Sequence, residues 1–187
     1  NDRDNIKHTY SRVRFGTKVS RRDALHLALM SSENRMASAL ARHYPGGRSA
    51  FIRAMNNKAR QLGMRNSRFY DSTGLSTRNV PTARELAKLI TPAYRQPLIR
   101  QFTQDTNKEM RFSTPAYSLM FNNTNPLVKN PDWDVRLSKT GYTDEAGRCL
   151  LMRAKPDRQE LAIVLLNSVG KRTPIGDANR IRKWLKS

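Results

Sequence analysis

The residues of this chain whose types and spacing could support chemistry come from two short stretches. The first is Ser32-x-Asn34, a hydroxyl and a carboxamide that lie between two apolar segments. The second, much later in the chain, begins with Lys139 and Thr140, which bring a cation and a hydroxyl together. Gly141 follows, and its lack of a side chain lets a ligand approach the backbone. This combination predicts an edge that can hold a carboxylate or a carbonyl oxygen.

Each stretch also has an ordinary structural interpretation. Ser32 could cap the helix that follows it, and Asn34 could satisfy a loop, because serine and asparagine are common caps. Lys139-Thr140-Gly141 could be a strand that ends in a turn, since short motifs match often by accident. These interpretations stay open for each stretch taken alone.

The elements that must position the first stretch are two helices. Ser20 followed by Asp23 is typical of a helix N-terminus, and residues 25–30 are apolar almost all round, as in a buried helix. Residues 36–43 again have helical spacing. The polar pair is therefore expected between two helices at the core, where buried hydroxyl and amide groups need partners.

A strand is expected to position the second stretch. Apolar Trp133, Val135 and Leu137 alternate with polar residues, which predicts a strand with one buried face, running from Trp133 to Thr140. Such a strand places Lys139 and Thr140 on opposite faces.

The order of helix-like and strand-like segments along the chain predicts an α+β fold with helices first, then an antiparallel sheet, then a helix. Residues 1–187 form a single domain in this interpretation, with residues 20–131 as a mainly helical lobe with loops and residues 132–187 as strands and a terminal helix. Further helices are expected at 49–62, beginning at Thr82, and around 98–99, followed by loops and short strands at 103–131. Further strands are expected at 148–154 and 160–169. The last helix is expected at 177–185 and carries Ile181, Trp184 and Leu185 on one face.

Composition narrows the function classes. The 187 residues include 35 basic and 15 acidic ones, a formal net charge of +20, which predicts attraction to polyanions. The basic residues form no long run and are not interleaved with aromatic residues, so we expect no nucleic-acid partner. No apolar run is long enough to span a membrane. The three histidines (His8, His26 and His43) and the single Cys149 lack ligand spacing, so we expect no metal and no cofactor.

Ser-x-Asn followed by Lys-Thr-Gly matches two of the three motifs of penicillin-binding serine acyl-transferases. The chain resembles the low-molecular-mass penicillin-binding proteins of the D-alanyl-D-alanine endopeptidase/carboxypeptidase type, in the serine β-lactamase/DD-peptidase superfamily. The resemblance covers nearly the whole chain and rests on Tyr10-Ser11-Arg12-Val13, residues 27–35 (LALMSSENR), His43-Tyr44-Pro45-Gly46-Gly47, Thr73-Gly74-Leu75-Ser76, Thr82-Ala83-Arg84 and Lys139-Thr140-Gly141.

This resemblance implies a β-lactamase/DD-peptidase-like fold and a periplasmic enzyme. Such enzymes cleave D-alanyl peptide bonds of peptidoglycan through a serine acyl-enzyme and are inhibited by β-lactams. By the same resemblance Ser32 would relay protons to the leaving group, Asn34 would hold the substrate amide, and Lys139 would supply positive potential and orient Ser32. The substrate-binding residues would be Thr140, Gly141, Tyr142 through its backbone N–H in the oxyanion hole, and Arg172.

The chain departs from the family at the nucleophile. The Ser-x-x-Lys motif, which carries the attacking serine and its base, is expected upstream of Ser-x-Asn, and residues 1–31 contain no match. The one textual match, Ser168-Val169-Gly170-Lys171, comes after Lys-Thr-Gly and is interpreted as chance. We therefore expect the C-terminal portion of an enzyme whose N-terminal segment is cut away or travels as a separate piece. Such a chain would be inactive alone; the alternative is a non-catalytic peptidoglycan-binding homologue.

Overall fold

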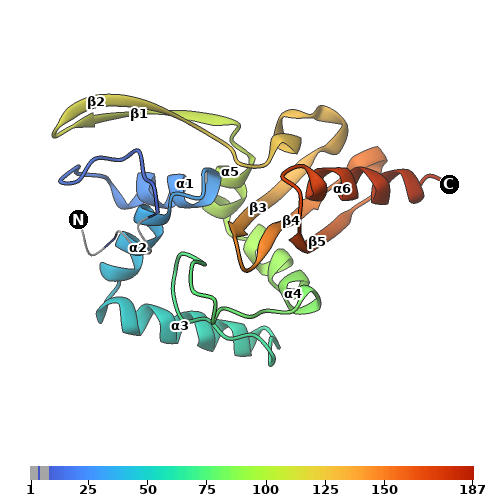
Figure 1. Cartoon of the computed structure of the whole chain (residues 1–187), viewed down its shortest axis with the longest axis horizontal. Helices are drawn as coiled ribbons and strands as arrows, with labels where there is room; N and C mark the ends of the chain where they lie inside the picture. The colour runs from blue at the N-terminus through green and yellow to red at the C-terminus, as the bar shows by residue number, and fades with distance from the viewer. Residues whose placement is uncertain (1–3, 5–8) are drawn as a thin grey trace.

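The computed structural model describes Asp4 and residues 9–187, so His8 lies outside the described residues. Its helices occupy much of the first half of the chain and its very end (Figure 1). They are α1 (Arg21–Met30), α2 (Asn34–Arg42), α3 (Gly47–Gln61), α4 (Ala83–Tyr94), α5 (Pro97–Gln104) and α6 (Thr173–Trp184).

The strands form two separate antiparallel sheets. One is a hairpin of β1 (Asn107–Ser113) and β2 (Ala116–Asn122), and the other is the meander β3 (Val135–Thr143), β4 (Gly147–Ala154) and β5 (Leu161–Ser168). Short 3-10 turns lie at Pro126–Lys129, Pro131–Trp133 and Pro156–Arg158. The predicted α+β class and the predicted meander are confirmed.

The helix ends follow from local sequence. The Ser20 hydroxyl accepts from the Asp23 backbone N–H at 3.0 Å, as the N-terminal pattern predicts. The cap of α2 is Glu33, whose carboxylate accepts from the Met36 N–H at 3.1 Å. The interpretation of Ser32 as the cap is therefore wrong, and its hydroxyl is not used to end a helix.

Strand β3 departs from the strict alternation that the sequence predicts. Val135 pairs with Ala154 but Leu137 pairs with Arg153, so the register shifts by one residue between them. Because directly paired residues share a face, Val135 and Leu137 lie on opposite faces of the sheet. Ser138, expected on the polar face, is buried with the core instead.

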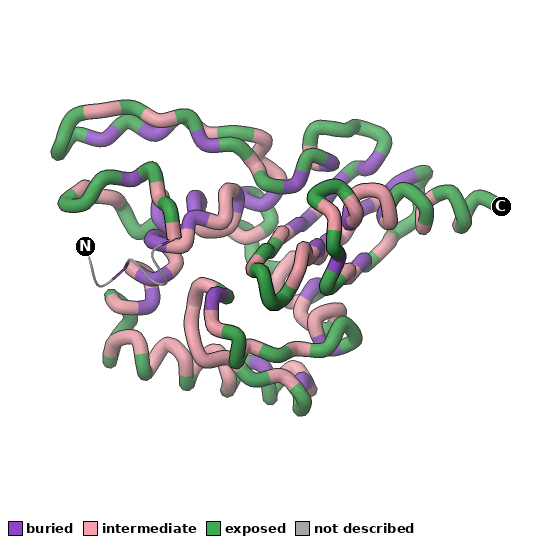
Figure 2. The backbone as a smooth tube through the Cα atoms, in the orientation of Figure 1, coloured by how far each residue is buried: buried purple, intermediate pink, exposed green. Residues whose placement is uncertain are grey.

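Two hydrophobic cores hold the molecule together (Figure 2). The first lies between α1, the start of α2 and the β1–β2 hairpin, and Leu27, Met30 and Phe112 belong to it. The second lies between one face of the meander and α6, around the fully buried Trp133. Helices α4 and α5 cover the other face of the meander, where the Arg153 guanidinium stacks on the Tyr94 ring.

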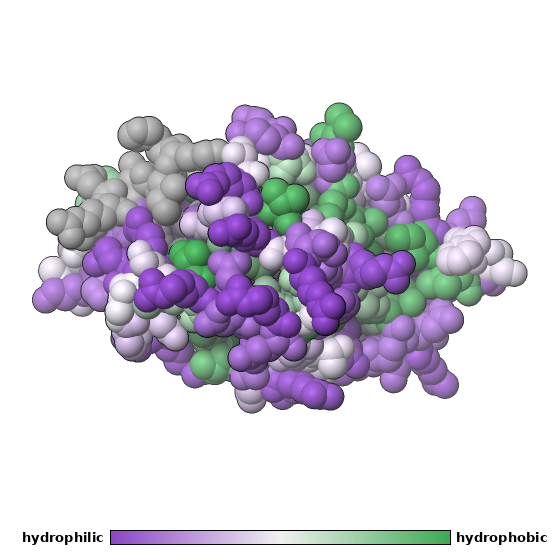
Figure 3. Space-filling view, turned by 90° about the horizontal axis from the view of Figure 1, so that it is seen from below, coloured by the Kyte–Doolittle hydropathy of each residue, from purple (hydrophilic) through white to green (hydrophobic). Residues whose placement is uncertain are grey.

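The terminal helix begins four residues earlier than predicted, at Thr173, because Pro174 fits its first turn. Ile181 packs on the second core, but Trp184 is 71% exposed, so the core covers only part of the face predicted to carry Ile181, Trp184 and Leu185. Within the described residues, no helix has both the length and the apolar character to cross a membrane. The face shown in Figure 3 is mostly hydrophilic, in keeping with the large net charge.

Candidate active site

The two polar stretches meet in space. Ser32 lies in the turn between α1 and α2, and Lys139 lies on β3. The Lys139 Nζ donates to the Ser32 hydroxyl oxygen and, at 2.7 Å, to the backbone carbonyl of Thr140. The Ser32 hydroxyl lies 3.5 Å from the same carbonyl oxygen. A hydroxyl, an ammonium group and the edge of a strand are thus brought together from opposite halves of the chain.

The turn that carries Ser32 is fixed by its neighbours. The Ser31 hydroxyl and the Glu33 backbone N–H both donate to the Leu27 carbonyl oxygen at 3.1 Å. Ser32 itself has φ of 54°, a left-handed conformation that is uncommon for a residue with a side chain. Backbone strain of this kind gathers at functional sites, where the surrounding structure imposes it. Here it turns the Ser32 hydroxyl away from the helix ends and toward Lys139.

The electrostatics of Lys139 are set by desolvation. Its side chain is enclosed between β3 and the α1–α2 turn, and this burial lowers the pKa of Lys139 to about 8. The partners of Nζ among the described residues are neutral oxygens, so no negative charge compensates for the lost hydration. The group is therefore a cation at neutral pH that can give up its proton more readily than an ordinary lysine.

Asn34 lies beside a cavity that adjoins Ser32. It is half-buried at the first turn of α2, and its side chain makes no hydrogen bond with the described residues. The carboxamide is thus available to a ligand. The cavity has a volume of about 250 Å³ and is lined by Tyr10, Ser11, Arg12, Ser31, Ser32, Glu33, Asn34, Phe121 and Asn122.

The end of β3 presents the remaining groups of the second stretch. The Thr140 hydroxyl donates to the Thr124 hydroxyl at 2.6 Å, and the Tyr142 hydroxyl donates to Asp144 at 2.7 Å. A side chain on Gly141 would meet Cys149 at an ordinary contact distance of 3.7 Å, so packing does not require glycine there. Since β3 is an edge of its sheet within the described structure, one side of this backbone is available to a ligand.

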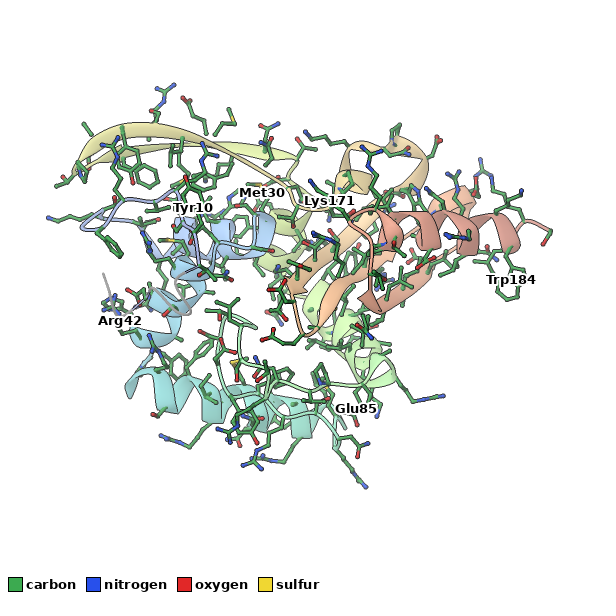
Figure 4. The ribbon with its side chains drawn as sticks, in the orientation of Figure 1. Tyr10, Met30, Arg42, Glu85, Lys171 and Trp184 are labelled. Atoms are coloured by element: carbon green, nitrogen blue, oxygen red, sulfur yellow. The ribbon has the colours of Figure 1, made fainter. Side chains whose placement is uncertain are left out.

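Arg172 does not join this group. It is exposed, precedes α6, and makes no side-chain hydrogen bond or ion pair with the described residues. Its neighbour Lys171 lies in the loop between β5 and α6 (Figure 4). The register places that loop at the same end of the sheet as Tyr142, because Tyr142 pairs with Arg148 and Arg148 pairs with Ser168. Arg172 is therefore near the correct end of the sheet but outside the cluster.

The one textual match to Ser-x-x-Lys, Ser168 to Lys171, is not arranged as an active-site serine and its lysine base would be. Ser168 is the last residue of β5, and Lys171 is exposed in the following turn before α6 begins at Thr173. The pair does not lie on one helix turn, where a serine and a lysine three residues apart would face each other. Its interpretation as chance agrees with this placement.

Two residues that shape the site, Glu33 and Thr124, are not among those predicted from the sequence. Glu33 is 8% exposed and caps α2. An N-cap side chain accepts from the backbone N–H three residues later, so the position of Glu33 three residues before Met36 was a signal for this role. Thr124 contacts Thr140 from the segment 103–131, for which only loops and short strands were predicted. The neighbours of Thr124 in the sequence do not indicate this contact, because it joins a loop to a strand that follows later in the chain. Among the described residues, no group of three or more His, Cys, Asp or Glu side chains could hold a metal ion.

The helices, the antiparallel sheet and the contact of Ser32 with Lys139 are arranged as in the DD-peptidase fold, whereas the cavity beside Asn34 is lined by no residue of β3. The computed structure superposes on the crystal structure of the Streptomyces K15 DD-transpeptidase with a TM-score of 0.83 and 26% identity, over 92% of this chain and 70% of that one. It also resembles penicillin-binding protein D2 of Listeria monocytogenes in its cefotaxime-bound form, with a TM-score of 0.75 and 24% identity over 88% of this chain and 66% of that one.

The sequence comparisons agree with the fold. Residues 1–170 match the D-alanyl-D-alanine carboxypeptidase family, a peptidase family. The chain is 50% identical to a D-alanyl-D-alanine endopeptidase of Escherichia coli and 48% identical to one of Pseudomonas aeruginosa, in each case over 97% of this chain. It spans 59% of the length of both relatives. The chain belongs to the D-alanyl-D-alanine carboxypeptidase family.

Proposed function

We propose that this chain is the main part of the active-site cleft of a peptidoglycan peptidase that cleaves D-alanyl peptide bonds through a serine acyl-enzyme. The observation that carries the proposal is the contact between the Ser32 hydroxyl and the Lys139 ammonium group, with the end of β3 beside it. The names and similarity of the endopeptidase relatives support the substrate class and favour the DD-endopeptidase reaction over the carboxypeptidase reaction.

In this proposal each group has one task. Ser32 passes a proton to the leaving amine, and the neighbouring Lys139 keeps that hydroxyl oriented. Asn34 holds the amide of the substrate, and Thr140 binds a substrate carboxylate or carbonyl. The backbone N–H of Tyr142 donates to the developing oxyanion; one such donor contributes roughly 3–4 kcal/mol to barrier reduction. Arg172, which is outside the cluster, would bind a substrate carboxylate only after its loop or side chain turns inward.

The nucleophile is assigned to residues outside this sequence. None of the 187 residues forms a Ser-x-x-Lys motif in a suitable place, while the chain spans 59% of its relatives' length. We infer that the natural protein supplies the attacking serine and its lysine base from a further segment, covalently joined or associated. This chain alone then has the partner groups of the reaction without an activated nucleophile.

Labelled penicillin tests the proposal, because β-lactams acylate the nucleophilic serine of such enzymes. The natural protein purified from its source should become covalently labelled, while the isolated 187-residue chain should not. Intact mass spectrometry of the natural protein should reveal a segment that carries Ser-x-x-Lys. Covalent labelling of the isolated chain would contradict the assignment of Ser32 and Lys139 as partners of an absent serine.

A second candidate is a peptidoglycan-binding homologue without turnover, and the missing Ser-x-x-Lys favours it. The two candidates differ in one result. Both bind purified cell wall, but only the enzyme releases peptides from cross-linked wall fragments. A natural protein that contains Ser-x-x-Lys and yet neither labels with penicillin nor releases peptides would support the binding role.

The location follows from the substrate. Because peptidoglycan lies outside the cytoplasmic membrane, we infer that the protein works in the periplasm. Release of the native protein by osmotic shock, with a cytoplasmic enzyme retained as the control, would support this inference. Recovery only with the cytoplasmic fraction would contradict it.

A further inference from the structure

We propose that Thr124 is a substrate-binding residue that forms, together with Thr140, a two-hydroxyl clamp for a ligand carboxylate. The proposal rests on the proposed function, because it assigns a second group to the carboxylate-binding place of the same cleft. It starts from one contact, the 2.6 Å hydrogen bond in which the Thr140 hydroxyl donates to the Thr124 hydroxyl. Thr124 comes from the loop after β2, so the pair joins two elements at the free edge of β3.

The backbone of Thr124 is held firmly from both sides. Its own N–H donates to the carbonyl oxygen of Met30, the last residue of α1, at 3.2 Å. On one side the Asn123 carboxamide donates to the carbonyls of Thr103 and Asp105 at 3.0 and 2.8 Å. On the other side Asn125 is 1% exposed, and its side-chain oxygen accepts from the Leu127 N–H at 3.1 Å.

The side chain of Thr124 has no part in this anchoring. It is exposed between a half-buried and a buried asparagine, and its hydrogen-bond partner among the described residues is Thr140. Fixing a backbone this tightly around an exposed hydroxyl gives that hydroxyl a defined position. The anchor at Met30 also sets Thr124 relative to Ser32, which lies two residues beyond the same helix end.

The hydroxyl pair has unused donor capacity. A hydroxyl carries one proton and two acceptor lone pairs. When Thr140 donates to Thr124, the Thr124 proton is available to a ligand oxygen. When a carboxylate arrives, the Thr140 proton can turn to one of its oxygens while Thr124 donates to the other, and hydrogen bonds to a charged acceptor are stronger than those between neutral groups. The clamp therefore exchanges one neutral hydrogen bond for two charge-assisted ones.

The nearest cation does not replace this clamp. Lys139 Nζ is directed at Ser32 and at the backbone carbonyl of Thr140, and no Lys or Arg side chain within the described structure donates to either threonine hydroxyl. Paired residues across β3 and β4 place the Lys139 and Thr140 side chains on opposite faces of the strand. As the described side chains are now placed, the two hydroxyls are therefore the groups that meet an anionic ligand group on the Thr140 side, and Arg172 would add to them only after it turns inward.

The test is the rate of acylation of the natural protein by labelled penicillin, which carries a carboxylate. Replacement Thr124→Val removes the hydroxyl at nearly constant shape and should raise the apparent dissociation constant about tenfold, with little change in the maximal acylation rate. Thr124→Ser should restore the wild-type constant. A variant that fails only because its structure is disturbed would raise the apparent dissociation constant and also lower the maximal acylation rate, and serine would not rescue it.

Thr91→Val is the matched control, because Thr91 is exposed on α4 and its hydroxyl makes no hydrogen bond with the described residues. In a Thr140→Val background, Thr124→Val should raise the apparent dissociation constant much less than it does alone, since the clamp is already broken. Wild-type binding by Thr124→Val would overturn the clamp while leaving the proposed function intact. A wild-type protein that is never labelled would overturn the function, and the clamp with it.

Discussion

At the scale of single residues, the site is defined by a cation whose partners are neutral. Lys139 donates to a hydroxyl and to a carbonyl oxygen, and neither group can offset the loss of hydration around an ammonium charge. Structural lysines that stabilise a fold are usually left in water or paired with a carboxylate. The arrangement around Lys139 costs folding free energy, which is typical of a residue kept for function.

This cost predicts a pH dependence of stability. Burial lowers the pKa of Lys139 to about 8 in the folded protein, whereas an ordinary lysine in the unfolded chain has a pKa of 10.5. Between these values the unfolded state binds more protons, so the free energy of unfolding must rise with pH. Wild type should therefore gain stability relative to Lys139→Met between about pH 7 and about pH 10, as measured by urea denaturation. A difference that stays constant or falls over this range would contradict the desolvation of Lys139.

The adjacent serines permit a controlled test of proton relay. Ser32→Ala removes the hydroxyl that Lys139 orients and should lower penicillin acylation of the natural protein by roughly 100-fold, the lower range for a lost acid–base group. Ser31→Ala removes a hydroxyl whose partner among the described residues is the Leu27 carbonyl oxygen. The Ser31 and Glu33 backbone N–H groups still hold that carbonyl, so the rate should stay within about twofold of wild type. Equal losses of acylation rate in the two variants would show that the rate depends on the structure of the turn and not on the Ser32 hydroxyl.

At the scale of elements, the turn between α1 and α2 depends on one buried carboxylate. Glu33 accepts the Met36 N–H at the start of α2, and its backbone N–H is bound to Leu27 of α1. A glutamate cap is unusual because its side chain is longer than those of the preferred caps. Because Glu33 takes this task, its two neighbours are not used to cap the helix: the Ser32 hydroxyl meets Lys139, and Asn34 lines the adjoining cavity.

Glu33→Ala should therefore reduce stability by about 1–2 kcal/mol, because α2 loses its cap and a buried N–H loses its partner. Urea denaturation at neutral pH measures this difference. Glu109→Ala is the control, since Glu109 is exposed on β1 and its ion-pair partner in the described part of the chain is the exposed Arg111, an interaction worth less than about 1 kcal/mol. Comparable losses in both variants would contradict the role of Glu33 as the cap.

At the scale of the whole molecule, the chain has a formal net charge of +20, and the face shown in Figure 3 is mostly hydrophilic. Such a charge attracts any polyanion over long distances, and this attraction weakens as salt screens it. Recognition of peptide groups in a cleft depends much less on ionic strength. The two modes of binding can therefore be separated by a salt titration.

We expect the protein to bind both duplex DNA and purified cell wall at low salt. As the salt concentration rises, binding to DNA should be lost and binding to cell wall should remain. Binding to DNA would follow counterion release, with a steep linear fall of log affinity against log salt. Co-sedimentation with cell wall and a filter-binding assay with DNA measure the two curves. A DNA affinity that survives higher salt better than cell-wall binding would favour a nucleic-acid function.

Much of the fold could be predicted because its signals are local. The cap at Ser20, the apolar helix that follows it and the meander after residue 132 depend on neighbours within one helical turn or one strand pair. The exposure of Trp184 could not be predicted, because helical spacing places a residue on a face without telling whether another element covers it. The contact of Thr124 with Thr140 likewise depends on where the loop after β2 meets β3.

The sequence by itself determined the α+β class, the two polar stretches and the family to which they belong, since these depend on residue types and short spacings. Only the tertiary structure decided that Lys139 meets Ser32. A strict alternation from Val135 would have turned Lys139 toward α6, and the register shift before Leu137 turns it to the opposite face, where the α1–α2 turn lies. A bulge adds one residue to one strand only, so its effect on side-chain direction appears when the partner strand is in place.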